Sequence, residues 1–164
     1  MILPAYIPAW FENNFFDIER LLMHVFGQLA PDVTFGCWKP DLWVDGQGDV
    51  PAVWFFKLPG AVVDWERNRE NHLIQAIAVT DDPDASKGLA GFVRGILMSL
   101  SDGAKVTGED GDTAQFWGAE ERSAPYMLSP EQQFDARVVP ATFCVTTNLR
   151  SNKRYTDMVR ALRA

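Results

Sequence analysis

The sequence predicts one α+β domain, in which a mainly antiparallel sheet is flanked by an N-terminal helix and a crossing helix. Two segments repeat apolar residues at helical spacing, and several β-rich runs are separated by turn-forming residues. A length of 164 residues suits a single domain that buries a full core without disulfides or a metal. We see no internal repeat or low-complexity stretch, which also favours one domain.

The two helices are predicted from their apolar stripes. The first should run from Asn14 to Leu29, with Asn13 or Asn14 as its N-cap and Pro31 ending the pattern. The second should be capped by Asp84 or Ser86 and should cross the sheet with one stripe: Leu89, Phe92, Val93, Ile96, Leu97 and Leu100. Its glycines are interpreted as sites of close helix packing: Gly88, Gly91 and Gly95.

The strands are predicted from β-rich runs between turn signals. ERNREN at 66–71 is expected to be a solvated tip, and Pro140 indicates a bulge or an edge position in the last strand. The expected strands are Val33–Trp38, Val50–Leu58, Ala61–Trp65 after a turn at Pro59 and Gly60, His72–Val79, Lys105–Thr107, Gln115–Gly118 and Phe134–Thr147.

Composition restricts the function classes. A formal net charge of −7 and a pI of about 4.7 argue against a nucleic-acid-binding protein, which needs a clustered basic surface. No apolar run approaches the roughly 20 residues that span a bilayer, and no basic residue precedes the apolar N-terminus as in a secretory signal. We therefore expect a soluble, unexported protein, with Cys37 and Cys144 as buried free thiols.

The chain divides by charge and apolar content into an apolar N-terminal arm at 1–11, an α+β domain at 12–149 and a basic extension at 150–164. The extension carries five basic residues against Asp157, a charge of +4 that leaves −11 for residues 1–149. Opposite charges predict that the extension docks on an acidic surface of its own or of a neighbouring chain.

Motifs for catalysis or metal binding are not found. The sequence contains no GxSxG, HExxH or CxxC, and His24 and His72 lack zinc spacing. The acidic runs DDPD at 81–84 and EDGD at 109–112 lack the ligand pattern of a calcium loop, and a helix cap and a turn explain them. We expect no enzymatic activity, no metal and no cofactor.

Aromatic residues are numerous, with six tryptophans and eleven phenylalanines. Trp54, Phe55 and Phe56 in succession place side chains on both sheet faces, and the arm adds further apolar surface, which predicts protein association. The alternative is a monomer that closes its own core with the arm. The candidate interaction residues are Tyr6, Trp10, Phe11, Trp43, Arg67, Arg69, Arg150, Lys153, Arg154 and Arg160.

The order of elements over about residues 12–149 resembles the tail terminator (tail completion) proteins of long-tailed bacteriophages. The resemblance is carried by the strand pair, the helix with "VRGIL" and the terminal strands: PAVWFFKLPGAVVDWERNRENHLIQAIAVTDDP, ASKGLAGFVRGILMSL and FDARVVPATFCVTTNLR. It implies a virion subunit, assembled in the host cytoplasm, that forms a ring, commonly a hexamer. Such a ring caps the tube of major tail protein, ends its polymerisation and meets the head connector. It brings no catalytic residues and no cofactor.

A ring that passes the genome should have an acidic lumen that does not hold DNA. The lumen candidates are Asp81, Asp82, Glu109, Asp110 and Asp112. Three other functions are left open: a small acidic enzyme whose carboxylates line a cleft between the sheet and the loop at 39–49, near His72; an adaptor that binds a host protein; and another neck or head-closure protein.

Overall fold

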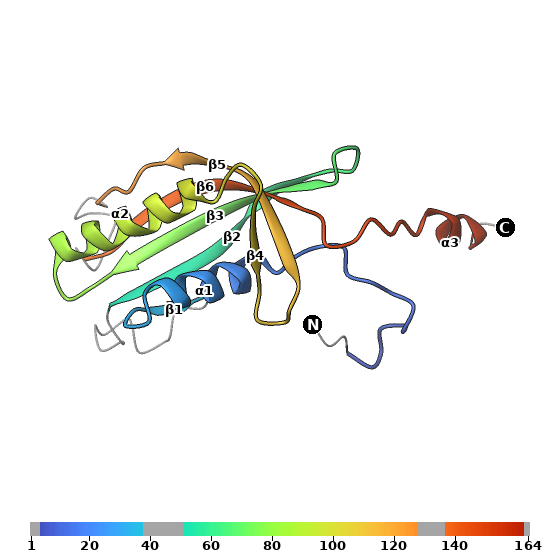
Figure 1. Cartoon of the computed structure of the whole chain (residues 1–164), viewed down its shortest axis with the longest axis horizontal. Coiled ribbons are helices and arrows are strands. Elements are labelled where there is room, and N and C mark those ends of the chain that lie inside the picture. Colours follow the sequence, from blue (N-terminus) through green and yellow to red (C-terminus); the bar gives the residue numbers. More distant parts are fainter. Residues whose placement is uncertain (1–3, 38–50, 128–136, 163–164) are drawn as a thin grey trace.

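The computed structural model describes residues 4–37, 51–127 and 137–162, and in them one six-stranded sheet with the strand order β1-β2-β3-β6-β5-β4. All pairings are antiparallel except β1 with β2 (Figure 1). The elements are α1 (Ile18–Leu29), β1 (Thr34–Gly36), β2 (Ala52–Asp64), β3 (Arg69–Val79), α2 (Pro83–Ser99), β4 (Ala104–Thr107), β5 (Thr113–Ser123), β6 (Val139–Asn148) and α3 (Thr156–Ala161). The predicted α+β class with a mainly antiparallel sheet is confirmed.

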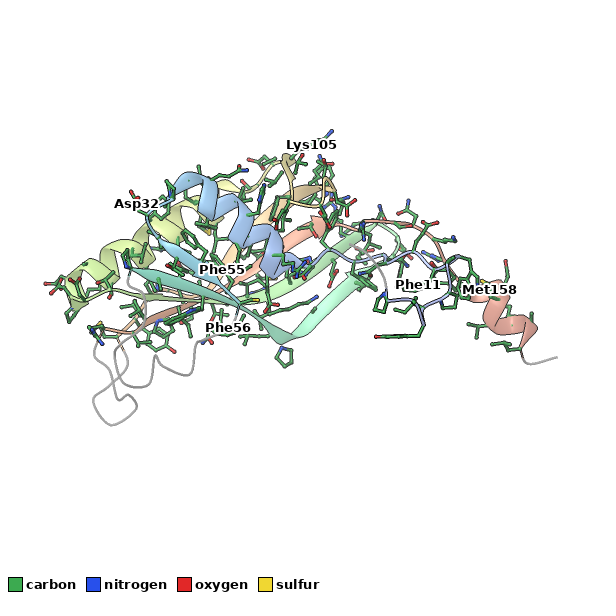
Figure 2. All side chains as sticks on the ribbon, turned by 90° about the horizontal axis from the view of Figure 1, so that it is seen from below. Phe11, Asp32, Phe55, Phe56, Lys105 and Met158 are labelled. Carbon is green, nitrogen blue, oxygen red and sulfur yellow. The ribbon has the colours of Figure 1, made fainter. Side chains whose placement is uncertain are left out.

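Both long helices cover the same face of the sheet. Phe55 points toward them and Phe56 points away (Figure 2). On the helix-covered face, Phe26 of α1 contacts Phe55 of β2 and Phe92 of α2, with ring centroids 5.1 and 6.0 Å apart. A second, smaller buried cluster of Ala52, Trp54 and Val79 lies apart from this core. The consecutive aromatics of β2 thus reach both faces, as their alternation predicts.

Both predicted helix starts are wrong by a few residues. Asp17 caps α1, because its carboxylate accepts the Arg20 N–H at 3.2 Å. Asn13 instead accepts the Phe15 N–H at 3.1 Å, a local turn that holds this segment outside the helix. Asn14 is used differently again, since its amide donates to the Lys153 carbonyl at 2.8 Å.

In α2 the cap is Asp82, and Pro83 follows at the first helical position, where its missing N–H costs nothing. The Asp82 carboxylate accepts the Ala85 N–H at 2.8 Å. Ser86 is buried inside the helix and its hydroxyl accepts the Thr80 N–H at 2.8 Å, so it anchors the preceding loop.

The strand pair β2–β3 differs from the prediction. Pro59 and Gly60 do not form a turn between two strands; β2 continues through them, with a register shift between Leu58 and Val62 that Gly60 accommodates at φ 110°. The turn comes later, ending at Asn68, and β3 already begins at Arg69. The prediction of ERNREN as a solvated tip is therefore wrong in its second half.

The predicted close packing at the α2 glycines is also wrong. All three are exposed, and a Cβ added to any of them would meet nothing within 4 Å among the described residues: Gly88, Gly91 and Gly95. Small residues here lie on the solvent side of the helix, because the buried stripe is carried by Ala90, Val93 and Leu97.

Pro140 lies in β6, an interior strand, but at a point where the missing N–H breaks no ladder bond. β5 pairs with β6 only as far as Thr142, and beyond it the Pro140 carbonyl accepts the Tyr126 N–H at 3.2 Å. β6 lies between β3 and β5 in the sheet, so Pro140 is not on an edge strand as predicted; it is tolerated where the pairing with β5 has ended. Cys37 and Cys144 are free thiols, as predicted, but half-buried rather than buried.

Candidate interaction surfaces

The two ends of the chain are joined in a projection that we call the terminal stalk, formed by residues 8–14 and 150–162. The Tyr155 hydroxyl accepts the Glu12 N–H at 2.7 Å and donates to the Glu12 carbonyl at 3.1 Å. The Lys153 ammonium donates to the Trp10 carbonyl at 2.9 Å and to the Glu12 carboxylate at 2.8 Å. Four backbone and side-chain contacts thus connect segments about 140 positions apart.

Aromatic contacts strengthen the terminal stalk. The Tyr155 ring lies 5.5 Å from both Trp10 and Phe11, and it is stacked on Phe11. Arg154 reaches the turn between β2 and β3, where its guanidinium lies 5.3 Å from the Trp65 ring and donates to the Trp65 carbonyl at 3.2 Å. Four of the predicted interaction residues, Trp10, Phe11, Lys153 and Arg154, are therefore gathered in one place within a single chain.

The stalk is also an electrostatic unit. Its hydrogen bonds from Lys153 and Ser151 lower the pKa of Glu12, and the hydrogen bond to Glu12 raises the pKa of Lys153. Both groups are exposed, so solvent screens the attraction and each pair contributes little. The basic extension nevertheless finds acidic partners on its own body, because Arg150 also forms an ion pair with Asp112.

Arg160 lies at the outer end of the stalk, where it forms an ion pair with Asp157 of the same helix at 3.5 Å. The other predicted interaction residues are dispersed, and Tyr6 is 86% exposed. Arg67 lies 3.8 Å from Asp64 in the β2–β3 turn. The Arg69 guanidinium covers the Trp117 ring of β5 at 4.2 Å. Trp43 lies outside the described residues.

The predicted lumen candidates occupy two separate places. Asp81 and Asp82 precede α2, whereas Glu109, Asp110 and Asp112 lie in the β4–β5 turn (Figure 1). Asp82 serves as a helix cap and Asp112 as the partner of Arg150. The structure does not bring the two acidic runs together.

A groove of about 780 Å³ lies between α1 and the β4–β5 turn. Its apolar residues come from the start and the exposed side of α1, and its rim carries acidic side chains from both elements. The lining is Phe16, Asp17, Arg20, Leu21, Met23, His24, Gly27, Gln28, Gly108, Glu109, Asp110 and Asp112. No sequence pattern predicts this groove, because its two sides are separated by about 80 positions and only tertiary packing places them opposite each other.

A polar cluster joins the neighbouring strands β2, β3 and β6. The His72 Nε2 lies 2.9 Å from the Thr147 hydroxyl, and its Nδ1 lies 3.3 Å from the Glu70 carboxylate, which also accepts from the Lys57 ammonium at 2.8 Å. The Nδ1 is close to the carboxylate but forms no hydrogen bond with it, so the hydrogen bond of the ring is the one between Nε2 and the Thr147 hydroxyl. Burial, helped by the Lys57 charge, lowers the pKa of His72 to about 3.

The carboxylate, histidine and hydroxyl of this cluster follow the order of a hydrolase triad, but solvent does not reach them. His72 and Thr147 are completely buried and Glu70 is 3% exposed, so substrate has no route to the hydroxyl in the described structure. The cluster is a structural device that neutralises a buried carboxylate inside β3. The other enzymatic hypothesis, a cleft beside the loop at 39–49, falls largely outside the described residues.

The described residues also bear on metal binding and on membrane insertion. Among residues 4–37, 51–127 and 137–162, no three His, Cys, Asp or Glu side chains are placed to hold a metal ion. None of the described helices is both long and apolar enough to cross a membrane.

Exposed aromatic and apolar side chains, on the terminal stalk and at several other places on the single α+β domain, are typical of a protein that assembles with others. Comparison with known families is specific: a family model described as phage tail termination protein matches residues 14–154. The chain belongs to this family and is a structural component of a phage tail, acting among tail and head components. None of the curated proteins compared with it matches.

Proposed function

We propose that the protein assembles as a ring, hexameric as the resemblance implies, that caps the finished tail tube. The ring ends polymerisation of the major tail protein and presents its other side to the head connector. The observation that carries this proposal is the family match over residues 14–154, which spans the whole sheet and the root of the terminal stalk. Assembly would take place in the host cytoplasm, and the finished ring would stay in the virion.

Surface chemistry supports the proposal. Apolar side chains that a monomer would normally bury are exposed in several separate places, which suits a subunit with more than one neighbour. They include Trp10 and Tyr6 in the arm, Val62 and Trp65 near the β2–β3 turn, Trp117 in β5, and Met158, Val159 and Leu162 at the C-terminal end.

The first test is the mass of the protein in solution, by size-exclusion chromatography with light scattering. We expect a single species at an integral multiple of 18.4 kDa, seen as a ring in negative stain. Added to polymerising tube protein, it should shorten the tubes in proportion to its concentration and appear at one tube end. A strict monomer that leaves tube length unchanged would overturn the proposal, and one that instead captures a host protein would point to the adaptor hypothesis.

A further inference from the structure

A pocket of about 490 Å³ lies between the terminal stalk and the β2–β3 turn, apart from the groove beside α1. Its walls are aromatic: Phe15 meets Trp65 edge-on with ring centroids 6.3 Å apart, and Phe11 is stacked on Tyr155 at 5.5 Å. Phe11 lies on the stalk, beyond the end of the sheet (Figure 2). Both ends of the chain and a hairpin turn contribute to the lining, so the pocket exists only in the folded chain.

One hydrogen-bond acceptor of this pocket has no donor. Asn14 lines the pocket and is 7% exposed, and its amide nitrogen donates to the Lys153 carbonyl at 2.8 Å, which fixes the orientation of the amide. The Asn14 Oδ1 is thereby a buried acceptor, and it has no hydrogen-bond partner among the described residues. Buried polar atoms in folded proteins nearly always have a partner, so this oxygen requires an N–H group from a bound molecule.

The charge of the pocket favours an anion. Its lining contains Lys153 and Arg154 and no Asp or Glu. Lys153 is paired with Glu12, which lies outside the lining, whereas Arg154 forms no ion pair with a described carboxylate. The Arg154 guanidinium lies 5.3 Å from the Trp65 ring and donates to the Trp65 carbonyl, so it keeps further N–H groups for a carboxylate at the pocket rim.

We propose that this pocket binds the carboxyl-terminal aromatic residue of a partner protein. The ring lies against the aromatic walls, the carboxylate accepts from Arg154, and the backbone N–H donates to the Asn14 oxygen. A chain end supplies all three groups from a single residue, whereas an internal aromatic residue has no carboxylate of its own. The inference rests on the proposed function in one respect, that the partner is another tail or head protein, and it does not require the ring.

Small probes test the chemistry of the pocket in the wild-type protein, by saturation-transfer difference NMR. N-Acetylphenylalanine carries the ring, the N–H and the carboxylate of a chain end; its primary amide lacks the charge, and hydrocinnamate lacks the N–H. N-Acetylphenylalanine should bind about tenfold more tightly than its amide and about fivefold more tightly than hydrocinnamate, because a charged and a neutral hydrogen bond are lost in turn. No binding of N-acetylphenylalanine, or equal affinities for the acid and the amide, would overturn the site, and equal binding of hydrocinnamate would overturn the role of Asn14.

Matched variants place the binding in the pocket. Arg154→Gln should remove the preference for the acid over the amide, while Arg160→Gln, in α3 and outside the lining, should keep it. The uncharged amide should bind Arg154→Gln and the wild type equally, which shows that the pocket is intact. If Arg154→Gln also weakens the amide, Arg154→Lys decides, since it keeps the charge and should keep a preference for the acid. An Arg154→Gln protein with the wild-type preference, or an Arg154→Lys protein with none, would overturn the assignment.

Complementation tests whether a partner uses the site. In a phage deprived of this gene, the Arg154→Gln chain should restore fewer complete particles than the Arg160→Gln chain, and equal restoration would overturn the partner contact. Ring formation and tube length are measured on the same proteins, so the two proposals separate. Normal rings and tubes without probe binding would leave the proposed function standing, whereas a wild-type chain that binds the probes but forms no ring would overturn the ring and leave this site standing.

Discussion

Glu70 shows at the level of one residue why a charged strand position need not be solvated. The carboxylate is buried in β3 and is shared between the Lys57 ammonium at 2.8 Å and the His72 ring at 3.3 Å. The sequence pattern around it, with charges of both signs, is typical of an exposed turn. It could not reveal the burial, because Lys57 and Thr147 reach this point from other strands.

His72 should make the stability of the fold depend on pH. Burial lowers its pKa from 6.5 to about 3, so between these values the unfolded chain binds a proton that the folded chain does not. Stability is therefore fully present above about pH 6.5 and decreases as the pH falls toward 3. Over the interval from pH 6.5 to pH 5 the loss should be about 2 kcal/mol in the free energy of unfolding.

Urea unfolding at a series of pH values checks this prediction. The variant His72→Gln should lose this part of the pH dependence, because glutamine does not titrate. The matched control is His24→Gln, whose histidine lies on α1 with its Nε2 2.9 Å from the Gln28 amide, and this variant should keep the pH dependence that His72 causes. Equal slopes in the wild type and His72→Gln would contradict the assignment.

At the scale of elements, α2 can be stabilised by substitutions at its exposed glycines. Its three glycines face solvent with open space around them, so alanine there would add helix propensity without a clash. Gly91→Ala and Gly88→Ala should each raise the free energy of unfolding by about 0.5–1 kcal/mol. Ala90→Gly, on the buried side of the same helix, should lower it.

Thermal or urea unfolding of these variants measures the predicted changes in the free energy of unfolding. A Gly91→Ala chain that is stable as a monomer but assembles poorly would mean that another subunit lies against this helix. A chain destabilised in both respects would mean that the space found at Gly91 is not open.

In the terminal stalk, the contacts of one residue, Tyr155, connect the N-terminal and C-terminal segments. Tyr155→Phe keeps the ring contacts with Trp10 and Phe11 but removes both hydrogen bonds to Glu12. A neutral hydrogen bond is worth about 0.5–1.5 kcal/mol, so exchange of the Glu12 amide hydrogen should accelerate by about two- to tenfold. Tyr126→Phe, outside the stalk, serves as the control, and unchanged exchange in Tyr155→Phe would show that the two ends are not coupled.

Periodicity and turn residues predict correctly which segments are helices and which are strands, but they predict the first and last residue of each element less accurately. The apolar stripe of α1 and the alternation in β3 identify the correct structures, because local spacing determines which side is buried. The predicted start of α1 is wrong because Asn13 and Asp17 are equally good caps in sequence, and the structure uses Asp17 as the cap while Asn13 forms a local turn and Asn14 bonds to the C-terminal segment.

At the scale of the whole molecule, the candidate surfaces were only partly predictable. The opposite charges of body and extension indicate docking between them, and Arg150 with Asp112 and Lys153 with Glu12 are such contacts. The groove beside α1 was not predictable, because no sequence signal sets the angle between a helix and a hairpin so far apart along the chain. That Arg154 would find Trp65 depends on the same unpredicted arrangement.

Net charge leads to the last prediction, which concerns DNA. The chain carries −7, and the described body holds its basic residues largely in pairs with its own carboxylates, so a lumen of this protein should repel a polyanion. In a mobility-shift titration at about 0.1 M salt, the assembled protein should not bind duplex DNA. Binding tighter than the roughly 10⁻⁴ to 10⁻⁶ M of ordinary non-specific binders would contradict this.

Two charge reversals test which turn lines the lumen: Glu109→Lys in the β4–β5 turn and Asp81→Lys before α2. Both residues are exposed and neither caps a helix. Whichever turn lines the channel should give the variant ring a salt-dependent affinity for DNA, since each lysine brought to a phosphate releases counterions, whereas the same change on the outer surface should have a much smaller effect.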